Sequence, residues 1–431
     1  MRSYIFADTL KRALTYNGYK VRHVMNITDV GHMTSDADGG EDKVEKTARA
    51  EGRSPREVAD FYTNLFLEDL RKLNVQMPDV LCRATDHIAD MIALIEKILA
   101  RGYAYVAQSG VYFDVEKYRG TNRVGRLSRQ SLDEQYAGQR IEHAPDKKSP
   151  HDFALWVLNQ PNHIMQWDSP WGRGYPGWHI ECSAMAMKYL GETIDIHSGG
   201  IDHIPIHHEN EIAQSESATG KPFVRYFVHH AFLVGAEGAK ISKSAGQFPV
   251  LSDLQALGLH PLAFRLFCLG AKYRSELAFS LDAIRGAERN LVYLYNFAST
   301  VSDEETESDA EWVEPFEQRF HEAINNDLNT PQALAVALEM VAEAYRRNDR
   351  RIWRTLTRFD SVFGIGLEQI RAESRAPLPE EVTQLAEQRL EARRAKNYAL
   401  SDALRAKLLS MGYAVEDTPE GYRIKRRWGA S

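Results

Sequence analysis

Apolar positions in the first part of the chain alternate between helical spacing and strand spacing. Residues 3–18 carry apolar side chains at helical intervals, and Gly18 ends this predicted helix. A strand is expected over residues 20–26, with a polar loop at its carboxyl end. Further helices are expected at about 44–52, 55–74 and 85–102. A helix, a strand and a loop in this order are typical of a parallel nucleotide-binding sheet.

The middle of the chain contains the strongest strand patterns. Residues 103–115 predict a β-hairpin with a Ser-Gly turn, and a charged, irregular stretch follows it. We interpret about 103–165 as an insertion between the two halves of one α/β domain. The parallel sheet is expected to resume with the strand DFALWV, which begins at Asp152. It should continue with strands at 193–197 and 223–234.

Helical spacing dominates after residue 250. An acidic linker at 302–311 is expected to be solvated and mobile. The chain closes with two helices and a hairpin around a Pro-Glu-Gly turn. The predicted fold is a Rossmann-like parallel-sheet domain with an insertion, then an α-helical region, then a small terminal module of helices and hairpin. The expected boundaries are 1–249, 250–301, 312–375 and 377–431.

Composition places the chain among ordinary globular proteins. Of its 431 residues, 43% are hydrophobic and 26% are charged. The net charge is −7, so no global basic field indicates nucleic acid, although local patches can bind it. The three cysteines are too few and scattered for a disulfide framework, which favours a reducing, cytosolic setting. No long apolar run predicts a membrane span, and the N-terminus does not read as a signal peptide.

One short stretch combines residue types that suit a metal ion. His207 and Glu211 lie one helical turn apart in the sequence HHENEIAQSE, and Cys182 precedes them. Thiolate, imidazole and carboxylate are all zinc ligands, and three protein ligands with one open position are typical of a catalytic zinc. Taken alone, the pattern is also that of a solvated helix face and an ordinary buried cysteine.

Two further segments suit a nucleotide. Gly199 and Gly200 follow a predicted strand and precede a helix, and Asp202 is placed to take ribose hydroxyls. Lys240 and Lys243 flank Ser242 in a loop of small residues, where ammonium groups can stabilise charge on a transferring phosphate. Each segment has a plainer interpretation, since glycines often only form a turn and paired lysines often lie in a basic surface loop.

Taken together, these segments resemble the cysteinyl-tRNA synthetase family of class I aminoacyl-tRNA synthetases. KISKS at 240–244 resembles the family's KMSKS loop, HSGGID its ATP-binding segment, and GWHIEC with HHENEIAQSE its zinc-bearing segments. Other segments resemble the family in the same order along the chain: NITDVGH, PDVLCRATDHI, DFALW, YRSELAFS, NDLNTPQAL and the closing region 389–428. Several motifs in order are far more specific than any one of them.

The resemblance implies ATP-dependent activation of L-cysteine as an adenylate and its transfer to tRNA(Cys), by a cytoplasmic monomer. ATP would be a substrate, with Mg²⁺, and one Zn²⁺ would be held by Cys182, His207 and Glu211. The catalytic residues would be Lys240, Ser242 and Lys243. ATP would be bound by Gly199, Gly200, Asp202 and Lys243, and cysteine by Thr28 and Trp178. Residues 250–301 would contact the tRNA stem, and residues 377–431 would help to recognise the anticodon.

One departure from the family concerns the N-terminus. The family begins with a strand that carries a zinc-binding cysteine, followed by the HIGH signature, whereas this sequence begins with a segment that resembles the helix after that signature. A late start codon or a truncated form would explain this, and we favour the first. Two alternatives to the synthetase remain open: a ligase that joins cysteine to an amino sugar in thiol biosynthesis, and a non-catalytic tRNA-binding remnant.

As numbered, the chain is therefore expected to bind zinc weakly and to form little cysteinyl adenylate, because a zinc ligand and the HIGH histidines are missing from the sequence. A pyrophosphate-exchange assay measures adenylate formation directly. Full activity in that assay would contradict this expectation.

Overall fold

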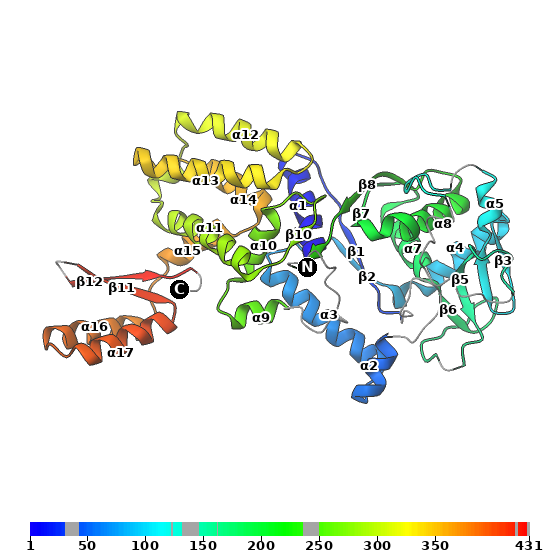
Figure 1. Cartoon of the computed structure of the whole chain (residues 1–431), viewed down its shortest axis with the longest axis horizontal. Helices are drawn as coiled ribbons and strands as arrows, with labels where there is room; N and C mark the ends of the chain where they lie inside the picture. The colour runs from blue at the N-terminus through cyan, green and yellow to red at the C-terminus, as the bar shows by residue number, and fades with distance from the viewer. Residues whose placement is uncertain are drawn as a thin grey trace. The chain divides into compact units, whose positions relative to one another are not determined.

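The computed structural model describes residues 1–30, 43–121, 124–131, 146–161, 163–235, 250–418 and 421–428. These residues form two compact units (Figure 1). The sheet unit comprises residues 20–70 and 76–232, and the helical unit comprises residues 1–19, 71–75 and 233–431. No helix within the described ranges is both long enough and apolar enough to cross a membrane.

Parallel strand pairs form part of the sheet unit, as the sequence predicts. Strand β1 (Val24–Ile27) pairs with β2 (Val80–Arg83), and β7 (Ile194–Gly200) pairs with β8 (Val224–His230). Strand β1 begins later than expected, and β7 continues through the two glycines. The connections between paired strands are helical, which parallel pairing requires. They contain α2 (Lys43–Glu51), α3 (Pro55–Lys72) and α8 (Glu209–Thr219).

The region predicted to be an insertion, together with the residues just after it, contains an antiparallel sheet with the strand order β3-β4-β5-β6. The four strands are β3 (Ala104–Val106), β4 (Gly110–Phe113), β5 (Phe153–Leu158) and β6 (Gly174–Pro176). The hairpin prediction is confirmed. The predicted return to the parallel sheet at DFALWV is wrong, because β5 pairs antiparallel with both of its neighbours. Every residue of β5 is buried, so its unbroken apolar run imitates a parallel strand.

Among the residues that the structure describes, the sheet unit also contains the helices α4 (Ile88–Ala100), α5 (Val115–Arg119) and α7 (Trp178–Leu190). A 3₁₀ turn, η1 (Ala84–His87), precedes α4. Helix α4 buries an apolar face, including Met91 and Ile95, in one core with Leu155 of β5 and Ile180 of α7. The antiparallel sheet therefore shares its core with α7, the helix that carries Cys182.

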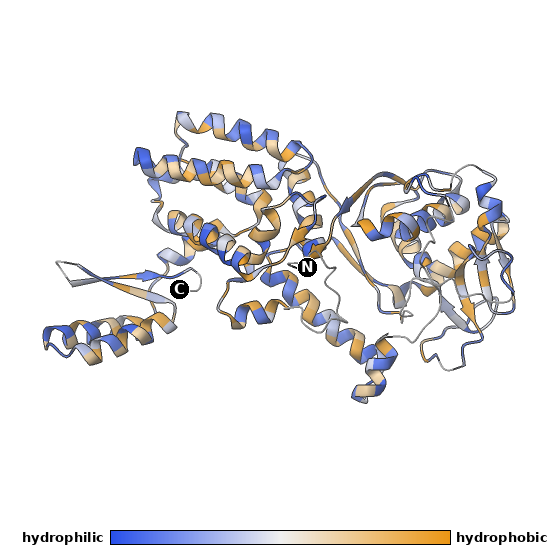
Figure 2. Ribbon diagram, viewed as in Figure 1, coloured by the Kyte–Doolittle hydropathy of each residue, from blue (hydrophilic) through white to orange (hydrophobic). Residues whose placement is uncertain are grey.

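The helical unit consists mainly of helices joined by short turns. Before the terminal module, its described helices are α1 (Arg2–Tyr16), α9 (Leu251–Ala256), α10 (Pro261–Leu269), α11 (Leu281–Thr300), α12 (Glu314–Asn325), α13 (Thr330–Arg347), α14 (Trp353–Phe363) and α15 (Leu367–Arg375). Along α12 and α13, Figure 2 shows hydrophobic residues alternating with hydrophilic ones. This pattern is expected of helices that bury one face. A short parallel pair, β9 (Leu233–Val234) with β10 (Leu277–Ala278), belongs to this unit.

The acidic segment 302–311 is more ordered than its composition predicts. It contains the turn η5 (Glu304–Thr306) and runs into η6 (Glu311–Val313). The Asp309 carboxylate accepts hydrogen bonds from the backbone N–H groups of Arg354 and Thr355, in the first turn of α14. The first N–H groups of a helix have no partner within the helix. The Asp309 side chain therefore stabilises α14, although the two lie far apart in the sequence.

The terminal module contains the two helices and the hairpin that the sequence predicts. Helix α16 (Glu380–Arg394) packs beside α17 (Tyr398–Ser410), and β11 (Tyr413–Thr418) pairs antiparallel with β12 (Gly421–Arg426). The module has its own apolar core, which includes Val382, Leu385, Leu408, Tyr413 and Val415. Its buried Arg389 donates two hydrogen bonds to the two carboxylate oxygens of Asp417 on β11, at 2.9 and 3.2 Å.

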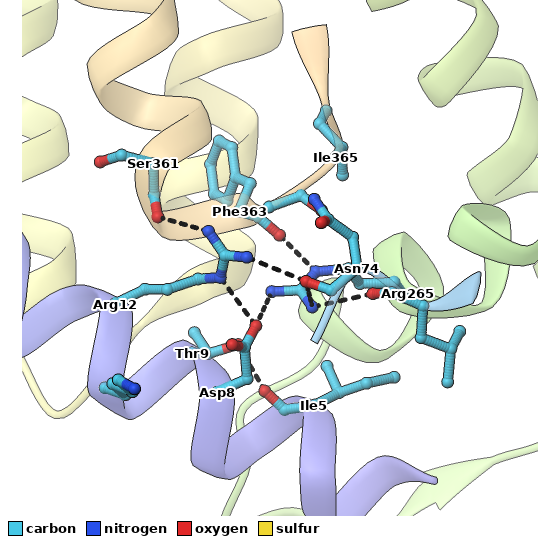
Figure 3. Close-up of polar contacts among 12 residues, drawn as sticks. Ile5, Asp8, Thr9, Arg12, Asn74, Arg265, Ser361, Phe363 and Ile365 are labelled. Carbon is cyan, nitrogen blue, oxygen red and sulfur yellow. Dashed lines mark hydrogen bonds and ion pairs between the residues drawn. The ribbon is translucent and has the colours of Figure 1, made fainter. Parts of the chain in front are cut away.

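A buried charge network joins four segments of the helical unit (Figure 3). The Asp8 carboxylate of α1 lies 2.5 Å from Arg265 Nη2 and 2.8 Å from Arg12 Nε, and the Asp8 and Arg265 side chains are fully buried. Arg265 also donates to the carbonyl oxygens of Phe363 and Leu73, at 2.5 and 3.0 Å. Burial lowers the pKa of Arg265, and the Asp8 charge opposes that effect.

Asp8→Asn should destabilise the helical unit strongly, because it leaves the Arg265 charge buried without a counter-ion. Breaking a buried pair in this way costs about 3–5 kcal/mol. Chemical denaturation followed by circular dichroism measures the change. Asp282→Asn is a matched control, because Asp282 pairs with Arg285 at the exposed surface, with 3.5 Å between their charged atoms. Removing this exposed pair should change the free energy of unfolding little. Equal stability of the two variants would contradict the role given to Asp8.

Candidate metal and amino-acid site

The candidate site begins where β7 ends. After Gly200 the chain forms a 3₁₀ turn, η2 (Ile201–His203), then a π-helical turn, η3 (Ile204–His208), and then α8. The sequence predicts an ordinary helix here, but a π turn lies where His207 and His208 enter the site. Both imidazoles are buried. Single π turns inside helical segments are frequent at functional sites.

The structure brings the three predicted metal ligands together. The ligand atoms of Cys182, His207 and Glu211 all lie within 4.8 Å of one another. Cys182 comes from the first turns of α7, His207 from η3 and Glu211 from the first turn of α8. The spacing of His207 and Glu211 places His207 Nε2 3.4 Å from Glu211 Oε1.

Glu211 is the centre of the polar contacts in this site. Its side chain is fully buried, and its Oε2 accepts a hydrogen bond of 2.6 Å from His197 Nε2. Among the described residues, Glu211 Oε1 has no hydrogen-bond partner. Burial alone would raise the pKa of Glu211, yet His197 and His207 hold it well below its usual value. Burial and the nearby Glu211 carboxylate raise the pKa of the Cys182 thiol.

Further histidines surround these residues, and the sequence patterns did not assign them a role. His179 Nδ1 lies 2.9 Å from His207 Nδ1, and His208 Nδ1 lies 2.8 Å from His229 Nε2. His197, His208 and Glu211 form a second group whose ligand atoms lie within 4.8 Å of one another. His197 could have been found from the sequence, because it is the last residue of the predicted strand and stands two positions before the glycine pair.

The two predicted cysteine-binding residues lie at the border of the metal candidates. The Trp178 ring lies 4.9 Å from the His207 ring, measured between centroids. Thr28 is exposed at the end of β1, and its Oγ1 accepts a hydrogen bond of 3.3 Å from Asn26 Nδ2. The same Asn26 amide lies 3.7 Å from Cys182 Sγ. Asn26 therefore links Thr28, a predicted cysteine-binding residue, to Cys182, a predicted metal ligand. No sequence signal distinguished Asn26 from an ordinary strand residue.

The predicted nucleotide residues fall partly inside the described structure. Gly199 lies on β7 against the histidine cluster, where an added Cβ would stand 2.7 Å from His203 Nδ1 and 2.8 Å from His208 Cε1. A Cβ added at the neighbouring Gly200 would likewise collide with the side chain of Asp202, which is exposed on η2. Lys240, Ser242 and Lys243 lie outside the described residues.

Gly199→Ala should displace the histidine rings and destabilise the sheet unit by about 1–3 kcal/mol, as overpacking does elsewhere. The denaturation midpoint measures this cost. The matched control is Gly286→Ala on α11, where the nearest atom is the end of the Arg289 side chain at 3.6 Å. A helical alanine is favourable, so the control should be neutral or slightly stabilising. Identical midpoints would argue against the close approach at Gly199.

Comparisons with known proteins agree on one family. A family model described as the tRNA synthetases class I (C) catalytic domain matches residues 1–289, and a DALR domain model matches residues 319–368. The cysteine–tRNA ligase of Treponema denticola is 42% identical, over 97% of this chain and 90% of its own length. Cysteine–tRNA ligase 1 of Burkholderia lata is 45% identical, over 98% and 88%.

The fold also matches a solved structure at low identity. A crystal structure of Mycobacterium tuberculosis methionyl-tRNA synthetase bound by methionyl-adenylate aligns with a TM-score of 0.57 at 17% identity. The alignment covers 89% of each chain. At this identity the likeness concerns the fold alone.

Proposed function

The chain belongs to the cysteine–tRNA ligase family of class I synthetases, and on this premise we propose how its residues divide the work of the reaction. The enzyme joins cysteine to tRNA with ATP as substrate. The observation that carries this conclusion is the extent of the match, which spans nearly the whole chain and includes the terminal module. An amino-sugar ligase built on the catalytic domain alone gives no reason for that module.

We propose that Cys182, His207 and Glu211 hold one Zn²⁺. Their donor atoms are those that zinc accepts, and they converge within 4.8 Å. The buried Glu211 Oε1, which has no hydrogen-bond partner among the described residues, is the oxygen available for a metal bond. When bound, Zn²⁺ supplies a soft Lewis acid that favours the thiolate of cysteine over the hydroxyl of serine, a distinction that pocket shape makes poorly.

The surrounding residues orient these ligands. His197 holds Glu211 Oε2, which directs Oε1 toward His207 and Cys182. His179 contacts Nδ1 of His207, which leaves the Nε2 atom facing Glu211. Partners that fix the orientation of metal ligands commonly affect metal affinity as much as activity. Trp178 and Thr28 would then hold the amino acid at the border of this site.

In the proposed reaction, the cysteine carboxylate attacks the α-phosphorus of ATP. A P–O bond to the β-phosphate breaks, and pyrophosphate leaves. Gly199 and Gly200 would allow close approach of ATP, Asp202 would take its ribose hydroxyls, and Mg²⁺ would accompany the phosphates. Lys240 and Lys243, with Ser242 between them, would stabilise the charge that develops on the departing pyrophosphate. A ribose hydroxyl of the tRNA then takes the cysteinyl group, and AMP leaves.

The remaining regions would bind the tRNA. We propose that residues 1–249 form the catalytic domain, that 250–301 contact the tRNA stem, and that 312–375 form a helical bundle. Residues 377–431 would recognise the anticodon, with exposed basic side chains facing the phosphates. The cysteines Cys82, Cys182 and Cys268 are all free thiols, which supports a cytoplasmic enzyme. We propose that it acts as a monomer.

Cys182→Ser should abolish zinc binding, because a serine hydroxyl does not ionise at neutral pH to replace the thiolate. Metal analysis of the purified protein measures zinc per chain. Cys268→Ser is the matched control, since that buried thiol lies on α10 in the helical unit and is not among the metal candidates. Unchanged zinc content in Cys182→Ser would rule out the ligand assignment.

Lys243→Ala should lower the rate of cysteine-dependent pyrophosphate exchange by about 10²–10³-fold from the low rate expected of this chain, the effect of removing one preorganised charge donor. Zinc content should stay the same, because Lys243 is not among the metal candidates. Retention of the full exchange rate would contradict the catalytic role of the lysine segment.

A further inference from the structure

One face of β1 is directed toward the helix that carries Cys182. Side chains alternate along a strand, so Val24 and Asn26 point to the same side, and Thr28 continues this alternation just past the strand end. Val24 packs against the apolar core that contains Ile180 of α7. The side chain of Asn26 therefore also points toward α7, two residues closer to the end of the strand.

The backbone around Asn26 is held by contacts that do not involve its side chain. Asn26 lies opposite Cys82 in the parallel pairing of β1 with β2. Just beyond the strand, the buried Asp29 carboxylate accepts hydrogen bonds from the Thr85 N–H and hydroxyl groups, at 2.9 and 2.8 Å. The strand and the loop after it are thus fixed on both sides of Thr28. Replacing the Asn26 side chain should leave this backbone in place.

The Asn26 amide makes two contacts through one nitrogen atom. Its Nδ2 lies 3.7 Å from Cys182 Sγ and 3.3 Å from Thr28 Oγ1. A side-chain amide nitrogen carries two hydrogens, so it can donate to both atoms at once. A single half-buried side chain therefore contacts a candidate metal ligand and a candidate cysteine-binding residue.

A hydrogen-bond donor is the group that a metal-bound cysteine sulfur needs as a neighbour. A cysteine must lose its proton to bind a metal, so its sulfur can then only accept hydrogen bonds. The Glu211 carboxylate, which lies within 4.8 Å of Cys182 Sγ, also only accepts when it is ionised. The Asn26 N–H group donates instead, and hydrogen bonds to metal-bound sulfur draw charge away from it.

We propose that Asn26 is a positioning residue, which holds the metal-bound sulfur of Cys182 and the hydroxyl group of Thr28 in one fixed arrangement. Its hydrogen bond to Cys182 Sγ orients that sulfur and lowers the negative charge on it. Its hydrogen bond to Thr28 Oγ1 fixes where Thr28 meets the amino acid and leaves the hydroxyl hydrogen of Thr28 for that ligand. The inference rests on the proposed roles of Cys182 as a zinc ligand and of Thr28 in binding cysteine.

A purely structural role for Asn26 predicts something different. If the side chain only filled a half-buried strand position, an apolar side chain of similar size would replace it without loss. Metal affinity, the electronic state of the Cys182 sulfur and cysteine affinity would then all stay the same. A positioning role predicts that all three change while the fold is retained, because the partners of bound ligands affect the metal site without carrying the core.

The test uses Co²⁺ as the probe, because Co²⁺ accepts the same donor atoms and a thiolate bound to it gives a charge-transfer absorption band. The metal-free full chain is titrated to saturation, which allows for the weak metal binding expected of this chain. Asn26→Leu should weaken Co²⁺ binding about tenfold or more. It should also move the band to longer wavelength, because the sulfur electrons lose the stabilising N–H group.

The matched control is Asn64→Leu, the same substitution at an exposed position of α3 in the same unit. It should leave both the Co²⁺ affinity and the band position unchanged. Asn26→Ala removes the same N–H group without adding bulk, so it gives the same test if Asn26→Leu folds poorly. Circular dichroism of each variant checks that the fold is retained.

A second titration measures how the amino acid binds. Cysteine added to the cobalt-loaded protein should strengthen the charge-transfer band, because a second sulfur joins the metal, whereas serine should not. Asn26→Leu should weaken cysteine binding about fivefold or more, the effect of losing one hydrogen bond that places Thr28. Thr28→Val should weaken cysteine binding as well, but it should leave the position of the band before cysteine addition unchanged.

The outcomes separate this inference from the proposed function. If the unaltered protein shows the thiolate band and Asn26→Leu matches Asn64→Leu, the positioning role is wrong and the ligand role of Cys182 stands. If the unaltered protein shows no thiolate band at saturation, the ligand role of Cys182 fails, and this inference fails with it. If Asn26→Leu shifts the band but binds cysteine as tightly as Asn64→Leu, the proposed placement of Thr28 by Asn26 is wrong.

Discussion

The helical unit depends on one buried carboxylate. Asp8 lies between two guanidinium groups, and those guanidiniums extend to carbonyl oxygens near residues 73 and 363. No part of this arrangement is local, since it joins the N-terminal helix to segments far along the chain. A buried charge must be matched completely or it destabilises the fold, so the network fixes the relative positions of α1, α10 and α14 within their unit. Gly364 fits against it in a left-handed conformation, where a side chain would collide with Arg265.

The sheet unit contains a second buried carboxylate that is satisfied differently. Glu211 has one oxygen bonded to His197, whereas its other oxygen lacks a hydrogen bond among the described residues and faces a thiol and an imidazole. Asp8 and Glu211 are equally inaccessible to water, but only Glu211 retains capacity for another partner. That difference separates a carboxylate that holds a fold together from one that can hold a ligand.

Much of this architecture could be predicted from the sequence, because most elements carry their own local signal. The helices and the terminal hairpin follow from periodicity and turn residues, and the parallel pairs follow from strands alternating with helices. Strand β5 was misassigned because a strand buried on both faces looks the same in parallel and antiparallel sheets. The sequence grouped Cys182, His207 and Glu211 as possible ligands and offered His197 only through its place before the glycine pair. Asn26 gave no such signal, since its contact with Cys182 arises only when β1 meets the distant helix α7. The composition of the acidic segment 302–311 wrongly predicted a mobile linker. Its Asp309 accepts a hydrogen bond from the first turn of α14, which lies far along the chain and cannot be recognised from the segment itself.

The π-helical turn at 204–208 has a consequence for how this site can change over time. A π turn holds one more residue than the α-helical turn it replaces, so it is sensitive to length rather than to chemistry. Removing one residue there would restore regular winding and rotate every earlier position by about 100° relative to α8. His203 and the glycine strand would then face away from Glu211, although the His203 and Glu211 side chains were both still present. Substitutions across this stretch can be compensated by neighbours, but a single-residue insertion or deletion cannot, so the segment from β7 to α8 should keep its length even where its residues vary.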